Sequence, residues 1–178
     1  LEQAAIALPA SAPDLSLSAE PTDLDFTPVS IHLSVGLSLL QLERPDQGRS
    51  VIAAIADNPA QAHLKITTLL AFANAQLEGV SPTERAFLLS EAERLLPAVD
   101  SEFQQISQLN VAEAYLNSGN SEKARQLATP LAESLSAADD SAFNQLYQLP
   151  SLFVLLGDYE RAVSIAQQFP DEDVLSRL

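Results

Sequence analysis

The chain has 178 residues, of which 47% are apolar and none is cysteine. This length can bury a core without disulfide bonds, and the lack of cysteine excludes thiolate metal sites and thiol nucleophiles. The 24 acidic and 9 basic residues give a net charge of −15, which disfavours nucleic acid and anionic membrane surfaces as partners. No apolar run approaches the roughly 20 residues of a membrane span, so we expect no direct membrane insertion.

Residues 1–28 form a proline-rich acidic extension or linker that contains no basic residue. This composition predicts an extended or disordered segment. Apolar residues within it leave open a second possibility, in which the segment docks in a groove of the remaining chain; they are Leu15, Leu17, Leu24 and Phe26. Because the chain begins with Leu1 and residues 1–8 resemble the end of a helix, we expect it to be processed or cut from something longer.

From residue 29 onward the sequence repeats with a period of 38 residues. The triplet Glu84-Arg85-Ala86 recurs as Glu122-Lys123-Ala124 and Glu160-Arg161-Ala162. This period divides the repeat domain, residues 29–170, into units over 29–59, 60–98, 99–137 and 138–170, followed by a capping segment over 171–178.

Each unit is predicted to be a helix-turn-helix. The first helices are expected over 29–42, 60–78, 101–118 and 140–156, and the second helices over 45–57, 82–96, 121–135 and 158–169. Asn58, Ser81 and Ser101 each stand three residues before a Glu or Gln, the spacing of a capping box.

Small residues recur at related positions and predict close helix crossings. They are Gly36, Ala73 and Ala112 in the first helices, and Gly48, Ala86, Ala124 and Ala162 in the second helices. The apolar face between residues 106 and 116 is too wide for one helix contact, so we expect that helix to be packed on two sides.

The third unit carries Ala112, Tyr115, Gly119 and Ala124 in the order small residue, aromatic, turn glycine and second-helix alanine. This pattern resembles the tetratricopeptide repeat family. The fourth unit matches from Leu156 to Ala162 but has Pro150 inside its first helix, which should kink or delay that helix. The first two units match less well, and the family period is about 34 residues.

The resemblance implies an all-α, tetratricopeptide-like solenoid of about four units. In this family the units form a right-handed superhelix, and the first helices line a concave groove that binds a peptide or protein segment. The resemblance implies no catalysis.

The residues themselves also argue against catalysis and cofactors. His32 and His63 are the only histidines, too few for a zinc site without cysteine, and we expect them to be solvated or capping. The acidic runs Asp139-Asp140 and Asp171-Glu172-Asp173 precede predicted helices, where they complement the helix dipole. We therefore predict no enzyme, no cofactor and no metal site.

The expected groove is rich in amide and apolar side chains. Lys65 is the only basic residue on the predicted first helices, so we expect a protein or peptide partner that is neutral or basic rather than acidic. Amide side chains can both donate to and accept from an extended backbone. The candidate partner-binding residues are Leu109, Asn110, Glu113, Leu116 and Asn117 in the third unit, and Asn144, Tyr147, Gln148 and Ser151 in the fourth.

Three hypotheses for function follow. The first is a non-enzymatic protein–protein interaction module, acting as a scaffold or assembly factor. The second is a structural segment of a larger helical-repeat protein whose function lies elsewhere, with the polar groove residues merely solvated. The third, an enzyme that uses carboxylates as acid and base, depends on nothing more specific than the number of acidic residues.

Overall fold

A computed structural model describes residues 28–42, 44–55, 59–74, 80–135 and 146–168. These residues form helices and the turns between them, without any strand in the described ranges. The helices are α1 (Pro28–Gln41), α2 (Pro45–Ala53), α3 (Pro59–Asn74), α4 (Pro82–Leu95), the 3-10 turn η1 (Leu96–Ala98), α5 (Ser101–Asn117), α6 (Ser121–Leu135), α8 (Leu149–Leu155) and α9 (Tyr159–Ala166).

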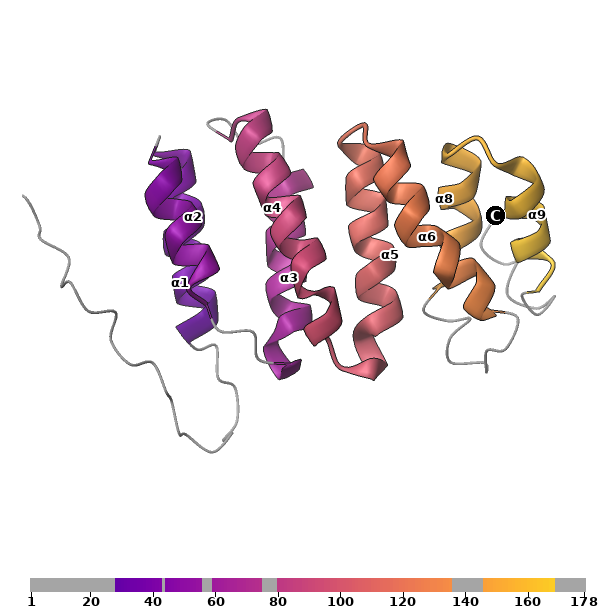
Figure 1. Ribbon diagram of the computed structural model, residues 1–178, viewed down its shortest axis with the longest axis horizontal. Coiled ribbons are helices and arrows are strands. Elements are labelled where there is room, and N and C mark those ends of the chain that lie inside the picture. The colour runs from indigo at the N-terminus through magenta and orange to yellow at the C-terminus, as the bar shows by residue number, and fades with distance from the viewer. Residues whose placement is uncertain (1–27, 43, 56–58, 75–79, 136–145, 169–178) are drawn as a thin grey trace, which may run out of the picture.

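The helices pair into hairpins that lie side by side in chain order (Figure 1). The contacts within each pair are more extensive than those between pairs. The pairs are α1 with α2, α3 with α4, α5 with α6 and α8 with α9. Between hairpins, α3 packs along α5, with smaller contacts between α1 and α3 and between α6 and α8. The prediction of an all-helical chain built from helix-turn-helix pairs is thus confirmed for the described residues.

The start of α4 follows the predicted capping box. The Ser81 hydroxyl accepts a hydrogen bond from the Glu84 amide at 3.2 Å, and the Ser81 amide donates to the Glu84 carboxylate at 3.0 Å. The box predicted at Ser101 is wrong, because Asp100 is the N-cap of α5 and makes no side-chain cap bond. Gln104 instead donates to the Leu96 carbonyl at 3.0 Å, which joins α5 to the turn η1. Asn58 lies outside the described residues.

The turns of the last two hairpins repeat at the predicted interval of 38 residues. Gly119 and Gly157 have φ angles of 86° and 77°, a left-handed conformation that suits glycine. The amide after each glycine donates to a carbonyl five residues earlier, Asn120 to Tyr115 and Asp158 to Phe153, both at 2.9 Å. Equivalent backbone geometry therefore ends α5 and α8.

The first hairpin has a crossing that only glycine fits. A Cβ atom added to Gly36 would lie 2.6 Å from Ile52 Cγ1, and one added to Gly48 would lie 2.7 Å from the Gly36 carbonyl oxygen. The predicted close crossing of α1 and α2 is therefore confirmed. Buried alanines take the corresponding second-helix positions in the last two hairpins, Ala124 in α6 and Ala162 in α9.

Ala86 of α4 was predicted to be equivalent to Ala124 and Ala162, and this prediction is wrong. Ala86 is exposed, and the side chains of Glu84 and Leu88 are buried instead. The reason is the cap. Ser81 places Arg85, and not Ala86, four residues into the helix, whereas Asn120 places Ala124 there. A one-residue offset turns a helix by about 100°, which moves Ala86 away from the core.

The first helix predicted for the fourth unit is interrupted by a turn. Tyr147 and Gln148 form a turn, and α8 begins at Leu149 with Pro150 in its first turn. Proline is tolerated there because its missing amide has no intrahelical partner at a helix start. The continuous helix predicted over 140–156 is therefore wrong, and the kink or delay expected at Pro150 takes the form of a turn between helical Leu146 and α8; residues 140–145 lie outside the described ranges.

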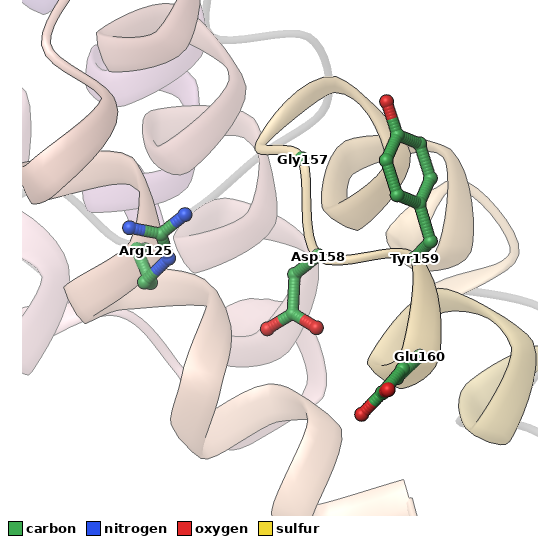
Figure 2. A pocket seen from close by; sticks show the side chains of 5 residues that line it. All are labelled: Arg125, Gly157, Asp158, Tyr159 and Glu160. Carbon is green, nitrogen blue, oxygen red and sulfur yellow. The ribbon is translucent and has the colours of Figure 1, made fainter.

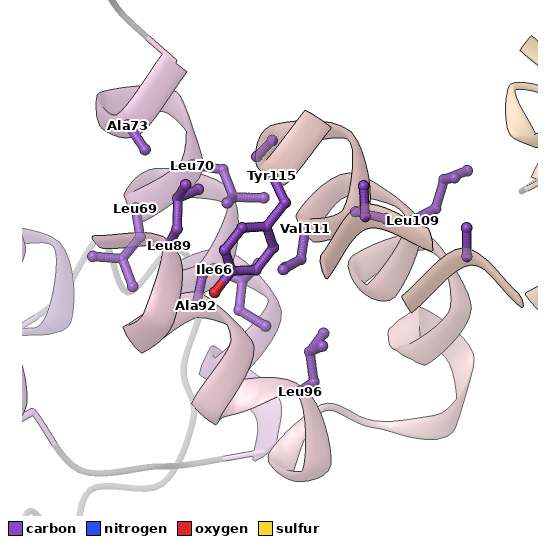
Figure 3. Packing of buried hydrophobic residues seen from close by; sticks show 14 of the residues in the cluster. Ile66, Leu69, Leu70, Ala73, Leu89, Ala92, Leu96, Leu109, Val111 and Tyr115 are labelled. Atoms are coloured by element: carbon purple, nitrogen blue, oxygen red, sulfur yellow. The ribbon is translucent and has the colours of Figure 1, made fainter. Parts of the chain in front are cut away.

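The helix α5 is packed on two sides, as its wide apolar face predicts. It contacts α6 in its own hairpin and α3 and α4 in the hairpin before it. Figure 3 shows Val111 and Tyr115 of α5 in one cluster with Ile66 and Leu70 of α3. The core is therefore continuous from one hairpin to the next.

Candidate partner-binding site

One side of α5 remains accessible and forms the candidate site, which we call the α5 stripe. It consists of Phe103, Ile106, Asn110, Glu113 and Asn117, whose spacings of three and four residues place them on one side of a helix. Phe103 and Asn117 are exposed, and the three residues between them are half-buried. The stripe thus combines an aromatic ring, an alkyl group, two amides and one carboxylate.

Three of the predicted third-unit residues lie in this stripe, namely Asn110, Glu113 and Asn117. Leu109 does not, because it is completely buried and belongs to the core. Adjacent residues on a helix point about 100° apart, so the position before Asn110 is turned inward. Leu116 is half-buried and packs against the core, which leaves it at the border of the surface.

The predicted fourth-unit residues belong to the neighbouring hairpin. Tyr147 and Gln148 lie in the turn before α8, where the Gln148 amide nitrogen donates to the Tyr147 hydroxyl at 2.7 Å. Ser151 is exposed in the first part of α8, and Asn144 lies outside the described residues. Because Tyr147 and Gln148 lie in this turn and not in α8, they do not share one continuous helical face with Ser151.

Phe103 and Ile106 are members of the stripe that the sequence-based prediction missed. Both would be found by stepping backward from Asn110 in intervals of four and three residues. Phe103 stacks on His63 of α3, with ring centroids 4.8 Å apart and planes inclined by 19°. His63 Nδ1 also lies 2.8 Å from the Ser107 hydroxyl oxygen, so this histidine joins α3 to α5 and is not the solvated or capping residue predicted.

Glu113 is the carboxylate of the stripe, and its side chain is half-buried. Burial raises the pKa of Glu113 above its ordinary value of 4.5. Within the described ranges, no side chain or backbone amide donates a hydrogen bond to this carboxylate and no cation pairs with it. A half-buried acceptor without a donor can be satisfied by a group from outside the chain.

Lys65, the one basic residue on these first helices, cannot reach a partner. Its side chain is 1% exposed, and Nζ donates to the Ile55 carbonyl at 3.1 Å and to Glu91 Oε1 at 3.4 Å. Burial alone would raise the pKa of Glu91, but hydrogen bonds and charges from Arg94 and Lys65 lower it overall. The described first helices therefore expose no cation on the surface that carries the α5 stripe.

A second surface feature is a shallow hollow of about 420 Å³ between α6 and the turn that joins α8 to α9. Figure 2 shows Arg125 on one side and the carboxylates of Asp158 and Glu160 on the other, with the Tyr159 ring pointing away from both. Arg125 donates to the Leu156 carbonyl at 2.8 Å, and Asp158 accepts from the Arg161 amide at 3.2 Å. Both groups serve to join and cap helices, so this hollow is not the better candidate.

No cluster of three or more potential metal-binding side chains occurs in the part of the chain that the structure describes. Within the same part, every helix is too short or too polar to cross a membrane.

Comparison with models of protein families, with curated proteins and with solved structures gives no match to this chain.

Proposed function

We propose that this chain is a non-enzymatic protein–protein interaction module, a solenoid of the tetratricopeptide type whose first helices bind a neutral or basic peptide segment. The observation that carries this proposal is Glu113, a half-buried carboxylate in the middle of the α5 stripe to which no described residue donates a hydrogen bond. The stripe is the part of the first-helix surface to which we assign binding.

The chemistry of the stripe favours a donor from the partner. A carboxylate that has lost water without gaining a donor binds a cation or an N–H group more strongly than a fully solvated one does. Asn110 and Asn117 lie on either side of Glu113 and offer both donors and acceptors to a peptide backbone. The exposed Phe103 ring adds an apolar surface on which an alkyl chain or a cation can rest.

The dimensions of the stripe suit a short segment. The 14-residue separation of Phe103 and Asn117 corresponds to about 21 Å along the helix axis. An extended peptide covers that length with about six residues. The net charge of −15 would also attract a basic partner and increase its association rate at low ionic strength.

Peptide binding to Glu113→Gln tests the assignment. We expect the unaltered chain to bind lysine-containing peptides more tightly than glutamate-containing peptides of the same length. Glu113→Gln should reduce this preference about tenfold, equivalent to roughly 1.4 kcal/mol. Fluorescence anisotropy with labelled peptides would give both dissociation constants.

Glu122→Gln is the matched control, since it removes the same charge from an exposed position at the start of α6. Equal losses for the two variants would mean that overall charge, and not the stripe, selects the peptide. No loss for either would remove Glu113 from the proposed site.

A further inference from the structure

A second exposed surface lies on α1, in the first hairpin of the row. Ile31, Val35 and Leu42 are 62%, 49% and 70% exposed and follow one side of the helix; we call them the α1 apolar stripe. The helix α1 contains no charged residue, although the chain carries a net charge of −15. The surface is therefore suited to an apolar contact.

The repeat identifies which side of α1 this is. Two periods of 38 residues relate Gly36 to Ala112, and the same step relates Ile31 to Ser107 and Val35 to Val111. In α5 both equivalents are fully buried, and Ser107 bonds to His63 of α3. Figure 3 shows Val111 in the cluster that α5 forms with the hairpin before it. Ile31 and Val35 thus lie on the side that the preceding hairpin covers in α5, whereas Leu42, at the end of the stripe, corresponds to the exposed Ser118.

We infer that residues 15–26 of this chain cover the α1 apolar stripe. These residues directly precede α1, and the stripe spans about 17 Å along the helix, the length of about five extended residues. The 27 residues before Pro28 are more than enough to turn back and follow it. The inference does not depend on partner binding by the α5 stripe.

The composition of this segment fits the surface. Leu15 and Leu17, and again Leu24 and Phe26, alternate with polar residues, a pattern that in an extended segment would place each pair on one side. A segment of the same chain also has a high effective concentration at α1. A second copy of the chain would have to bring another net charge of −15 to the same surface.

The absence of cysteine allows a direct test, because Val35→Cys introduces the only thiol. The comparison chain carries Val35→Cys together with Leu15→Ser, Leu17→Ser, Leu24→Ser and Phe26→Ser. We expect a water-soluble maleimide to react with the thiol about tenfold more slowly in the chain without these four substitutions, because modification requires the uncovered state. Ser16→Ala with Ser18→Ala is the matched control and should leave modification slow. Thr67→Cys, at an exposed position of α3, supplies the rate for an uncovered thiol in a separate chain.

The remaining outcomes would overturn the inference. Equal fast rates in all three Val35→Cys chains would mean that nothing covers the stripe. Slow rates in all three, with a mass by light scattering that rises with concentration, would assign the surface to a second copy. Slow rates in all three at a constant monomer mass would assign it to another part of the chain. Circular dichroism spectra of each variant exclude unfolding as the cause of fast modification.

Discussion

At the scale of single residues, Gly36 and Gly48 allow α1 and α2 to approach closely. The α1–α2 crossing leaves no room for a methyl group, since a Cβ on Gly48 would also lie 2.8 Å from Leu40 Cδ2. Gly48→Ala should therefore lower the free energy of unfolding by about 1–3 kcal/mol, as overpacking typically does. In an uncrowded helix the same change would stabilise by up to about 1 kcal/mol, so urea denaturation distinguishes the two cases by sign.

Ser50→Ala is the control for Gly48→Ala, because Ser50 is exposed on the same helix. It should change stability by less than about 0.5 kcal/mol. A stabilising effect of Gly48→Ala would show that the two helices do not approach as closely as the structure has them.

The Glu93 carboxylate links the second and third hairpins and makes stability depend on pH. It accepts hydrogen bonds from the Tyr115 hydroxyl at 2.6 Å and from Lys123 Nζ at 2.7 Å. Burial alone would raise the pKa of Glu93, but these bonds and the Lys123 charge lower it below 4.5, while burial and the bond to Glu93 raise the pKa of Tyr115. Because the folded-state pKa of Glu93 is lowered, its contribution is present above pH 4.5 and is lost as the pH falls through the folded-state value.

We predict that Tyr115→Phe lowers the free energy of unfolding by about 1.5–3 kcal/mol at pH 7, since hydrogen bonds to charged groups contribute more than neutral ones. The difference from the unaltered chain should shrink on acidification, as Glu93 becomes protonated in the folded state. Urea denaturation at several pH values between 7 and 3 measures both. A difference independent of pH would mean that the hydroxyl acts through packing and not through the carboxylate.

At the scale of elements, a buried ion pair joins three helices. Lys65 of α3 reaches Glu91 of α4 and the carbonyl of Ile55, just after α2. Lys65→Met should lower the free energy of unfolding by about 3 kcal/mol, because it removes one partner of a buried charged group. Combining it with Glu91→Leu should recover part of this loss, since the buried carboxylate, which then keeps only Arg94 as a cationic partner, is also removed.

Lys123→Met is the matched comparison, because the Lys123 side chain is 41% exposed in its ion pair with Glu93. Its cost should be about 1 kcal/mol or less, as for exposed pairs. If both lysine variants had the same small effect by urea denaturation, the Lys65 site would be more hydrated than the structure implies.

Helix positions could be predicted from the sequence because their signals are local. The range predicted for α6, residues 121–135, agrees with Ser121–Leu135, and the turn glycines Gly119 and Gly157 set the ends of α5 and α8. The orientation of a helix is harder to predict, because one residue more or less before the first turn rotates every later side chain. This is why Ala86 is exposed although its triplet matches those of Ala124 and Ala162.

The candidate site was predictable only in part. The composition of the α5 stripe could be inferred from helical spacing, but Leu109 and Asn110 differ in burial because α3, α4 and α6 together cover most of α5. The burial of Lys65 depends on Glu91, which is 26 residues away in sequence. Such long-range pairs leave no periodic signal that a single sequence reveals.

At the scale of the whole molecule, acidic self-repulsion opposes the compact state. The chain has 24 acidic and 9 basic residues, and several basic side chains are already paired, including Arg49 with Glu84 and Arg94 with Glu91. Most carboxylates therefore have no compensating cation available within the chain. Folding brings these charges closer together, so screening should favour the folded state.

We predict that raising NaCl from about 20 mM to about 500 mM increases the free energy of unfolding, by about 1 kcal/mol, because the Debye length falls from roughly 20 Å to roughly 4 Å. Urea denaturation at a series of salt concentrations measures this dependence. Replacing the exposed acids Glu102, Glu122 and Glu160 by Gln should reduce the slope, since fewer like charges then repel. The buried pair of Lys65 and Glu91 is screened too little to produce an increase or a decrease in stability with salt. A decrease in stability with salt would therefore mean that exposed ion pairs such as Lys123 with Glu93 outweigh the repulsion.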